Sequence, residues 1–160
     1  MQTLSLDFFK HDSVVVAKEL VGKLLKVDNV LSRITETEAY RQDGSSHART
    51  RTNRSALMFD TYAHIYVYLI YGMYHCLNIT TEKDKPGAVL IRGIEPVSGI
   101  KCDGPGKLCR CLDITKKDNG RLLGGRISVL DDGFKLNIKV TERIGIKNDT
   151  HLPWRFVMDE

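Results

Sequence analysis

Residues 65–79 constrain the fold of this chain more than any other segment. The run is rich in Tyr, Ile and Val and is interrupted at Gly72-Met73. Aromatic and β-branched residues favour strands, and a glycine between two such runs is typical of a tight turn. The pattern predicts a β-hairpin, in which the two strands run antiparallel.

Further short strand patterns lie on both sides of this hairpin, at residues 23–27, 32–40, 88–94, 126–130 and 136–141. Two short helices are also expected, because Asp12-Ser13 can cap a helix that runs to about Val21 and residues 107–112 can form another. Strands and helices do not alternate along the chain. The pattern therefore predicts an α+β (mixed α/β) fold with a curved, mostly antiparallel sheet flanked by helices.

Length and composition bound the class of protein. The 160 residues predict one domain, residues 1–160, and a content of 42% hydrophobic and 28% charged residues excludes a wholly disordered or low-complexity chain. No run of 18 or more apolar residues occurs, and charges occupy the N-terminal stretch where a signal peptide needs apolar residues. We therefore expect a soluble, intracellular protein with no membrane partner.

Positive charge gathers in two stretches. Residues 41–54 hold four arginines against one aspartate, and residues 92–117 hold six basic against three acidic residues, although the whole chain carries only +4. The two stretches flank the aromatic hairpin, which suits a polyanion, with nucleic acid the first candidate. Ordinary solvated loops would carry the same charges.

Four cysteines, Cys76, Cys102, Cys109 and Cys111, could form disulfides or a zinc site. An intracellular location disfavours disulfides, and no pair shows the C-x-x-C spacing of a convincing zinc site. We therefore expect free thiols and no metal.

Large apolar side chains stand at the predicted hairpin turn, where polar residues are usual. Tyr71, Met73 and Tyr74 either pack beneath another loop or form a wedge that enters a base stack and kinks a duplex. Before the turn, Tyr66 and Tyr68 share one face of the strand, as period two requires. That face could stack an extruded base, although paired tyrosines in strands are more often part of a core.

Glu36, Glu38 and Tyr40 share one face of the strand at residues 32–40. Acidic pairs in strands are usually solvated. A carboxylate beside an aromatic wall also suits hydrolysis of a glycosidic bond, because an anion stabilises the oxocarbenium-like transition state and a base accepts the proton of the attacking water. His47, in the following loop, either contacts the edge of a base or is merely exposed.

Two polar residues interrupt otherwise apolar strands. Asn78 shares a face with Tyr68 only if the hairpin has an odd-length loop, Gly72 to Tyr74, or a bulge, so we predict one of these if both line a pocket. Arg92 must be paired or functional, and its candidate partners are a phosphate, Glu36 or Glu95.

Five features of the chain together carry a family resemblance. They are ETEAY at residues 36–40, His47, YVYLIYGMYHCLNI at residues 66–79, Arg92, and GPGKLC at residues 104–109. With weaker similarity over nearly the whole chain, they resemble the alkyladenine (3-methyladenine) DNA glycosylase family of base-excision repair. The resemblance implies a mixed α/β domain around a curved antiparallel sheet, with a protruding β-hairpin.

The resemblance also implies a role for each candidate residue. The catalytic residues would be Glu38, the general base that activates water, and Arg92, which positions a phosphate and that water. The flipped purine would be held by Tyr40, His47 and Tyr68. Asn78 would crowd the exocyclic amino group of guanine and so help to exclude that normal base. DNA contacts would come from Tyr71, which fills the gap in the duplex, and from Met73 and Lys107.

The implied partner is double-stranded DNA that contains damaged purines, such as 3-methyladenine, 7-methylguanine, hypoxanthine or ethenoadenine. Ring alkylation makes a purine a cation, which aromatic faces attract. The implied enzyme is a monomeric, monofunctional glycosylase without cofactor or metal, since no lysine falls in the matched pocket to form a Schiff base. We expect it in a bacterial cytoplasm, at the nucleoid, or in a nucleus if the source is eukaryotic.

Two other classes of function remain as alternatives. A catalytically silent nucleic-acid-binding domain on the same fold would keep the basic stretches and Tyr71 but could dispense with Glu38, so the presence of Glu38 favours the glycosylase. A zinc-dependent nucleic-acid enzyme would need a ligand spacing that this chain lacks.

Overall fold

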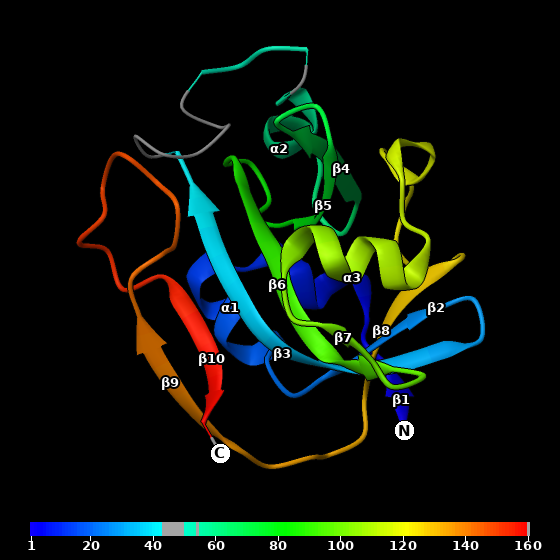
Figure 1. The fold of residues 1–160 in the computed structure, drawn as a ribbon. Coiled ribbons are helices and arrows are strands. Elements are labelled where there is room, and N and C mark those ends of the chain that lie inside the picture. The colour runs from blue at the N-terminus through cyan, green and yellow to red at the C-terminus, as the bar shows by residue number, and fades with distance from the viewer. Residues whose placement is uncertain (43–49, 54, 160) are drawn as a thin grey trace.

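The computed structural model describes residues 1–42, 50–53 and 55–159, and the strands within these ranges form one curved sheet (Figure 1). Its ten strands are β1 (Gln2–Thr3), β2 (Leu24–Val27), β3 (Val30–Arg41), β4 (Ile65–Ile70), β5 (Tyr74–Thr80), β6 (Gly87–Val97), β7 (Ile100–Cys102), β8 (Ile127–Asp131), β9 (Asn137–Thr141) and β10 (Arg155–Asp159). All strand pairings in the described part of the chain are antiparallel. The predicted α+β fold is confirmed.

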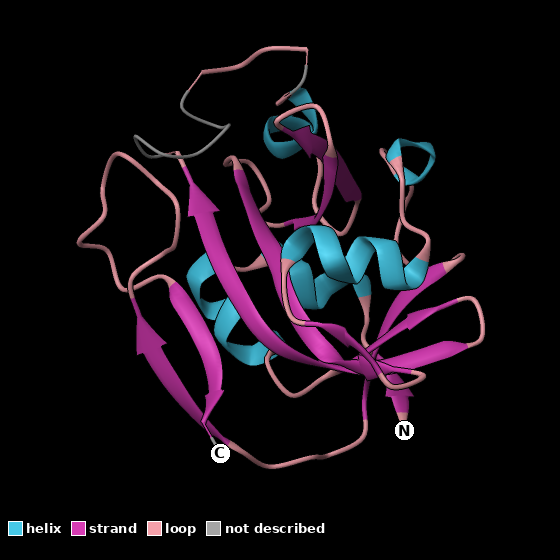
Figure 2. Cartoon of the chain, in the orientation of Figure 1, coloured by secondary structure: helices cyan, strands magenta, loops and turns pink. Residues whose placement is uncertain are grey.

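Three α-helices accompany the sheet in the described ranges, α1 (Ser13–Leu20), α2 (Ala56–Asp60) and α3 (Pro105–Leu112). Short 3-10 turns occur at Leu6–Lys10 and Lys116–Asp118. Figure 2 shows helices on both sides of the sheet, and the labels of Figure 1 place α1 behind β3 and α3 in front of β6. None of these helices is long and apolar enough to cross a membrane.

Strand β3 organises the sheet. One of its edges pairs first with β2 and then with β10, while the other edge pairs with β6. The register between β3 and β6 shifts on both sides of Glu36, and an irregularity of this kind bends a strand and increases its twist. The bend lies beside the residues that the sequence singled out as an acidic face.

Helix α1 begins and ends close to the predicted positions. The side chain of Asp12 accepts a hydrogen bond of 2.7 Å from the backbone N–H of Val14 and so caps the helix. The helix ends at Leu20, and Gly22, with a φ of +93°, turns the chain toward β2. The inner face of α1 packs against β3 and β6.

The two strands predicted in the C-terminal part do not pair with each other. The strands expected at residues 126–130 and 136–141 form, but β8 pairs with β1 and β2 whereas β9 pairs with β10. Strand β10 itself was absent from the prediction, because its sequence RFVMD holds only three apolar residues between charged ends. It returns the end of the chain to β3.

The expectation of free cysteines is wrong for Cys102 and Cys111, which form a disulfide. The turn at Gly104-Pro105 folds α3 back over β7, so that the two Cα atoms lie 6.3 Å apart, within disulfide range. Sequence spacing does not reveal that the C-terminal end of α3 returns to β7. Cys76 and Cys109 are buried and take no part in a disulfide, as expected.

Candidate active site

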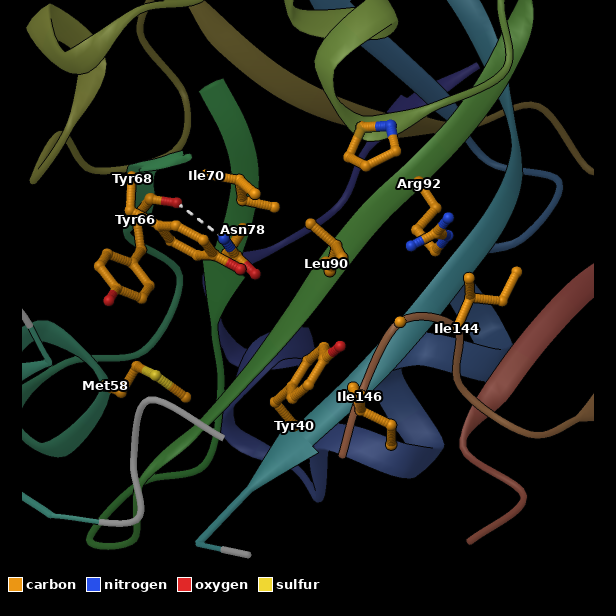
Figure 3. Close-up of a pocket in the computed structure, with 12 residues that line it drawn as sticks. Tyr40, Met58, Tyr66, Tyr68, Ile70, Asn78, Leu90, Arg92, Ile144 and Ile146 are labelled. Carbon is orange, nitrogen blue, oxygen red and sulfur yellow. Dashed lines mark hydrogen bonds between the residues drawn. The ribbon is translucent and has the colours of Figure 1, made fainter. Parts of the chain in front are cut away.

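A cavity of about 200 Å³ lies where the hairpin, β3, β6, the start of α3 and the segment after β9 meet (Figure 3). Aromatic and aliphatic side chains form most of its wall, and one amide and one guanidinium supply polar groups. It is lined by Tyr40, Met58, Tyr66, Tyr68, Ile70, Asn78, Leu90, Arg92, Pro105, Ile144, Gly145 and Ile146. A concavity lined by aromatic and aliphatic residues, with a few polar groups that point into it, is typical of sites for small molecules and bases.

The hairpin brings Tyr68 and Asn78 to the same cavity. Its turn has three residues, 71–73, and Tyr66 lies directly opposite Asn78. The predicted odd-length loop is confirmed, although the loop begins one residue earlier than Gly72. Asn78 is only 3% exposed, and its Nδ2 donates a hydrogen bond of 3.2 Å to the carbonyl of Tyr66, which fixes the amide at the cavity wall (Figure 3).

Tyr66 and Tyr68 share a strand face but differ in burial. Tyr66 is 2% exposed and packs in a small cluster with Met58 and Ala88, whereas Tyr68 is only partly buried. The two ring centroids are 5.4 Å apart, with 47° between the ring planes. Tyr66 is therefore chiefly a core residue, as the alternative interpretation held, while Tyr68 presents aromatic surface to the cavity.

Glu38 lies beneath the cavity with its side chain fully buried. Tyr40, two residues along the same strand, donates its hydroxyl to Oε1 at 2.8 Å, which confirms that the two side chains share a face. The backbone N–H of Ile144 donates to Oε2 at 2.7 Å. Both carboxylate oxygens are thus held in place by groups that also line the cavity.

Arg92 faces this carboxylate from β6. Its Nε donates to Oε2 of Glu36 at 2.9 Å, and its Nη1 lies 3.8 Å from Oε1 of Glu38. The same Oε2 of Glu36 accepts a second bond of 2.8 Å from Nε of Arg155 on β10. The pairing of Arg92 with Glu36, one of the expected partners, is confirmed, and Arg155 is an addition that the sequence did not reveal.

Burial raises the pKa of Glu38 above its ordinary value, because the charged form loses its hydration. The pKa of Glu38 is lowered by Arg92, by the N–H of Ile144 and by the hydroxyl of Tyr40, but these three groups do not cancel the effect of burial. The nearby charge of Glu36 raises this pKa further. The pKa of the Tyr40 hydroxyl is also raised, first by burial and then by the Glu38 charge. Tyr40 therefore stays protonated and continues to donate to Glu38.

Comparison with known proteins shows the family to which this chain belongs. Residues 7–160 match the family described as methylpurine-DNA glycosylase (MPG). The chain belongs to this family. It is accordingly a DNA glycosylase, a hydrolase of N-glycosidic bonds, and the resemblance found in its sequence is confirmed.

Bacterial relatives agree with the family over nearly their full lengths. A protein of Sodalis glossinidius, named "Putative 3-methyladenine DNA glycosylase", is 46% identical over 161 residues, which cover 96% of this chain and 95% of the relative. A protein of Rickettsia rickettsii with the same name is 43% identical over 165 residues, which cover 98% and 90% of the two chains. A third, from Ehrlichia ruminantium, is 43% identical over 168 residues, which cover 98% and 89%.

The tip of the glycosylase hairpin projects into solvent. Tyr71 is 88% and Met73 69% exposed, so the alternative that these side chains pack beneath another loop is wrong for the described part of the chain. The base of the tip is anchored, because a Cβ placed on Gly106 would lie 3.1 Å from the side chain of Tyr74. Helix α3 thus approaches the hairpin so closely there that an alanine at position 106 would require the Tyr74 side chain to shift by a few tenths of an ångström.

The remaining predicted residues lie outside the cavity or outside the described structure. Lys107, on the exposed surface of α3, forms an ion pair of 3.3 Å with Asp103. His47 belongs to residues 43–49, outside the described residues. In the ranges that the structure does describe, no group of three or more His, Cys, Asp or Glu side chains is placed to hold a metal ion.

Several contributors to the site escaped the sequence analysis. Met58, Leu90 and residues 144–146 line the cavity, and Arg143 lies behind it with only 5% of its surface exposed. Residues 142–154 contain no helix or strand, so periodicity could not indicate which side chains point inward. A weak signal was available in Arg143 itself, because an arginine followed by Ile-Gly-Ile is a charge in an apolar setting.

Proposed function

We propose that this glycosylase releases alkylated and deaminated purines from double-stranded DNA. It acts as a monomer, turns the damaged nucleotide out of the duplex into the cavity, and leaves an abasic site. The names of its relatives, which specify 3-methyladenine, support the alkylated class of substrate. The observation that carries the proposal is a fully buried Glu38 carboxylate beneath a cavity walled by Tyr40 and Tyr68.

The aromatic wall accounts for base selection in this proposal. A flipped purine stacks between Tyr40 and Tyr68, with His47 as a further contact, and a ring-alkylated purine is favoured because it is a cation. Asn78, fixed by its bond to Tyr66, crowds the exocyclic amino group of guanine. Normal purines gain neither the charge nor the fit.

The chemistry is hydrolysis by an activated water. Glu38 accepts a proton from water while the water oxygen bonds to the anomeric carbon and the bond to the base nitrogen breaks, with its electron pair going to the base. In an alkylated purine this pair cancels the positive charge, so no acid is needed; a neutral base takes up a proton from solvent as it leaves. Arg92 Nη1 and Glu38 Oε1 are 3.8 Å apart, close enough for one water beside the pair to contact both atoms.

The same proposal limits the reaction to base release. No lysine is among the described residues that line the cavity, so no amine is placed there to attack the sugar and cleave the strand. The exposed Tyr71 enters the space vacated by the flipped nucleotide, while Met73 and Lys107 contact the flanking DNA. Phosphate contacts by the basic stretches make binding depend steeply on salt.

Base release from two substrates tests the proposal, a duplex with one hypoxanthine and bulk methylated DNA. The wild type should release base from at least one, whereas Glu38→Gln should bind lesion duplex and release none. Glutamine is a suitable replacement because its carbonyl can accept from the Ile144 N–H while its amide donates to the Tyr40 hydroxyl. Turnover by Glu38→Gln at the wild-type rate would remove the general-base assignment, and tight binding without release by the wild type would favour a silent binding domain.

A further inference from the structure

Arg143 is a buried cation that lies against the Tyr40 ring. Its guanidinium carbon is 4.8 Å from the centroid of that ring, and only 5% of the residue is exposed. At this distance a guanidinium interacts with the π-electrons of the ring. Arg143 lies outside the catalytic residues assigned above.

The guanidinium is held firmly in this place. Trp154 contacts it as a second aromatic partner, with its ring centroid 5.0 Å from the same carbon. Nη1 donates to the carbonyl of Ala39 at 3.2 Å and Nη2 to the carbonyl of Asp149 at 3.4 Å. The contact with Ala39, the residue before Tyr40, ties the charge to the strand that carries the ring.

The charge lies behind the cavity wall. Tyr40 and residues 144–146 line the cavity, whereas Arg143 does not. A base that stacks on Tyr40 therefore meets a ring whose π-electrons already interact with one cation. Polarisation of the ring and repulsion between like charges both weaken the attraction of this ring for a second cation.

We propose that Arg143 is a specificity-determining residue, which acts through the Tyr40 ring to reduce the preference of this glycosylase for cationic over neutral damaged purines. The inference rests on the proposed function, since it requires the damaged base to stack on Tyr40. The effect differs between stages of the reaction. A cationic purine binds less tightly beside Arg143, but it loses its charge as the glycosidic bond breaks. A neutral purine gains electrons as that bond breaks, so the positive charge of Arg143 assists its release.

The experiment compares release of 7-methylguanine, a cationic base, with release of hypoxanthine, a neutral base, from otherwise identical duplexes. Arg143→Gln should raise the ratio of kcat/KM for the cationic base to kcat/KM for the neutral base by about fivefold. The reason is that the repulsion between Arg143 and the cationic base, similar in size to a cation–π interaction, is lost. Arg143→Lys keeps the charge and should leave the ratio close to that of the wild type. Arg143→Met, which keeps length and apolar packing, should reproduce the glutamine result if Arg143→Gln does not fold.

A binding measurement separates charge from packing. In a Glu38→Gln background, Arg143→Gln should tighten binding of the 7-methylguanine duplex and leave binding of the hypoxanthine duplex unchanged. Single-turnover release of 7-methylguanine by Arg143→Gln with Glu38 intact should be slower, because the bound cation is no longer destabilised. Equal losses of activity on both bases, with an unchanged ratio of kcat/KM, would overturn the inference and show that Arg143 acts only through packing. Absence of release from both duplexes by the wild type would instead contradict the proposed function.

Discussion

Tyr40 and Glu38 are joined by a hydrogen bond of 2.8 Å between the tyrosine hydroxyl and the buried carboxylate, although only one residue separates them on β3. The tyrosine thus has two tasks in the proposed mechanism. Its ring forms part of the cavity wall, and its hydroxyl favours the ionised form of the base that activates water.

Tyr40→Phe should therefore change the pH dependence of base release. The hydroxyl lowers the pKa of Glu38, so its removal raises that pKa further and protonates the base at a higher pH. The acidic limb of the kcat/KM profile should move to higher pH, and the loss of activity should be larger at pH 6 than at pH 8. The aromatic wall is retained, so a uniform loss at all pH values would show that the hydroxyl does not act through Glu38.

Glu36→Gln should move the same limb in the opposite direction. The negative charge of Glu36 raises the pKa of Glu38, and its removal lowers that pKa. Glu36 also holds Arg92, so loss of a charge-assisted hydrogen bond, about 1.5 kcal/mol, should reduce the plateau rate by about tenfold. Glu95→Gln, at an exposed carboxylate on the same strand as Arg92, serves as the control and should leave both the limb and the plateau unchanged.

Local patterns were sufficient to predict much of the site. Period two placed Glu38 and Tyr40 on one face and also Tyr66 with Tyr68, and a requirement that Asn78 join them selected an odd-length hairpin loop. Each of these relations lies within one strand or one hairpin, where the backbone geometry converts sequence spacing directly into position.

Contacts between distant segments could not be predicted in this way. The N–H of Ile144 reaches Glu38 across 106 residues, and Arg155 reaches Glu36 across 119. Both depend on the pairing of β10 with β3, which no periodicity in either strand specifies. The disulfide between Cys102 and Cys111 depends likewise on how α3 folds back over β7.

Tyr71→Ala should weaken binding of lesion duplex by about tenfold but should affect a lesion in single-stranded DNA much less, since only the duplex leaves a gap in the stack to fill. Binding titrations with the Glu38→Gln protein avoid turnover during the measurement. Tyr71→Phe keeps the ring and should bind like the parent protein. Equal losses on both DNAs would exclude a wedge role for this exposed side chain.

Reduction of the Cys102–Cys111 disulfide should lower the thermal stability of the protein. Closure of a loop with a sequence separation of nine residues constrains the unfolded chain, and its release should cost about 2–3 kcal/mol. The Tm of the wild type should fall when reductant is added. Cys102→Ser should melt near the reduced wild type and should not respond to reductant. A wild-type Tm that is independent of reductant would indicate that this bond does not contribute.

The buried charge of Glu38 should also be visible in the stability of the fold. A carboxyl whose pKa is higher in the folded chain than in the unfolded chain disfavours the folded state when it is ionised. Ionisation of Glu38 should therefore lower the free energy of unfolding as the pH rises above about 4, the ordinary pKa of a glutamate in an unfolded chain. The Tm of Glu38→Gln, measured relative to the wild type, should therefore increase between pH 4 and pH 8.

Asp132→Asn provides the matched control for this last measurement. The Arg33 guanidinium lowers the pKa of Asp132 to about 2, so Asp132 stabilises the folded state above that pH and its loss should act in the opposite sense. The Tm of Asp132→Asn relative to the wild type should thus fall between about pH 2 and pH 4 and then stay level from pH 4 to pH 8, where only the difference for Glu38→Gln changes. If the Tm difference for Glu38→Gln were the same at pH 4 and pH 8, the carboxyl would ionise equally easily in the folded and unfolded chains. Burial would then not be what prepares it to accept a proton.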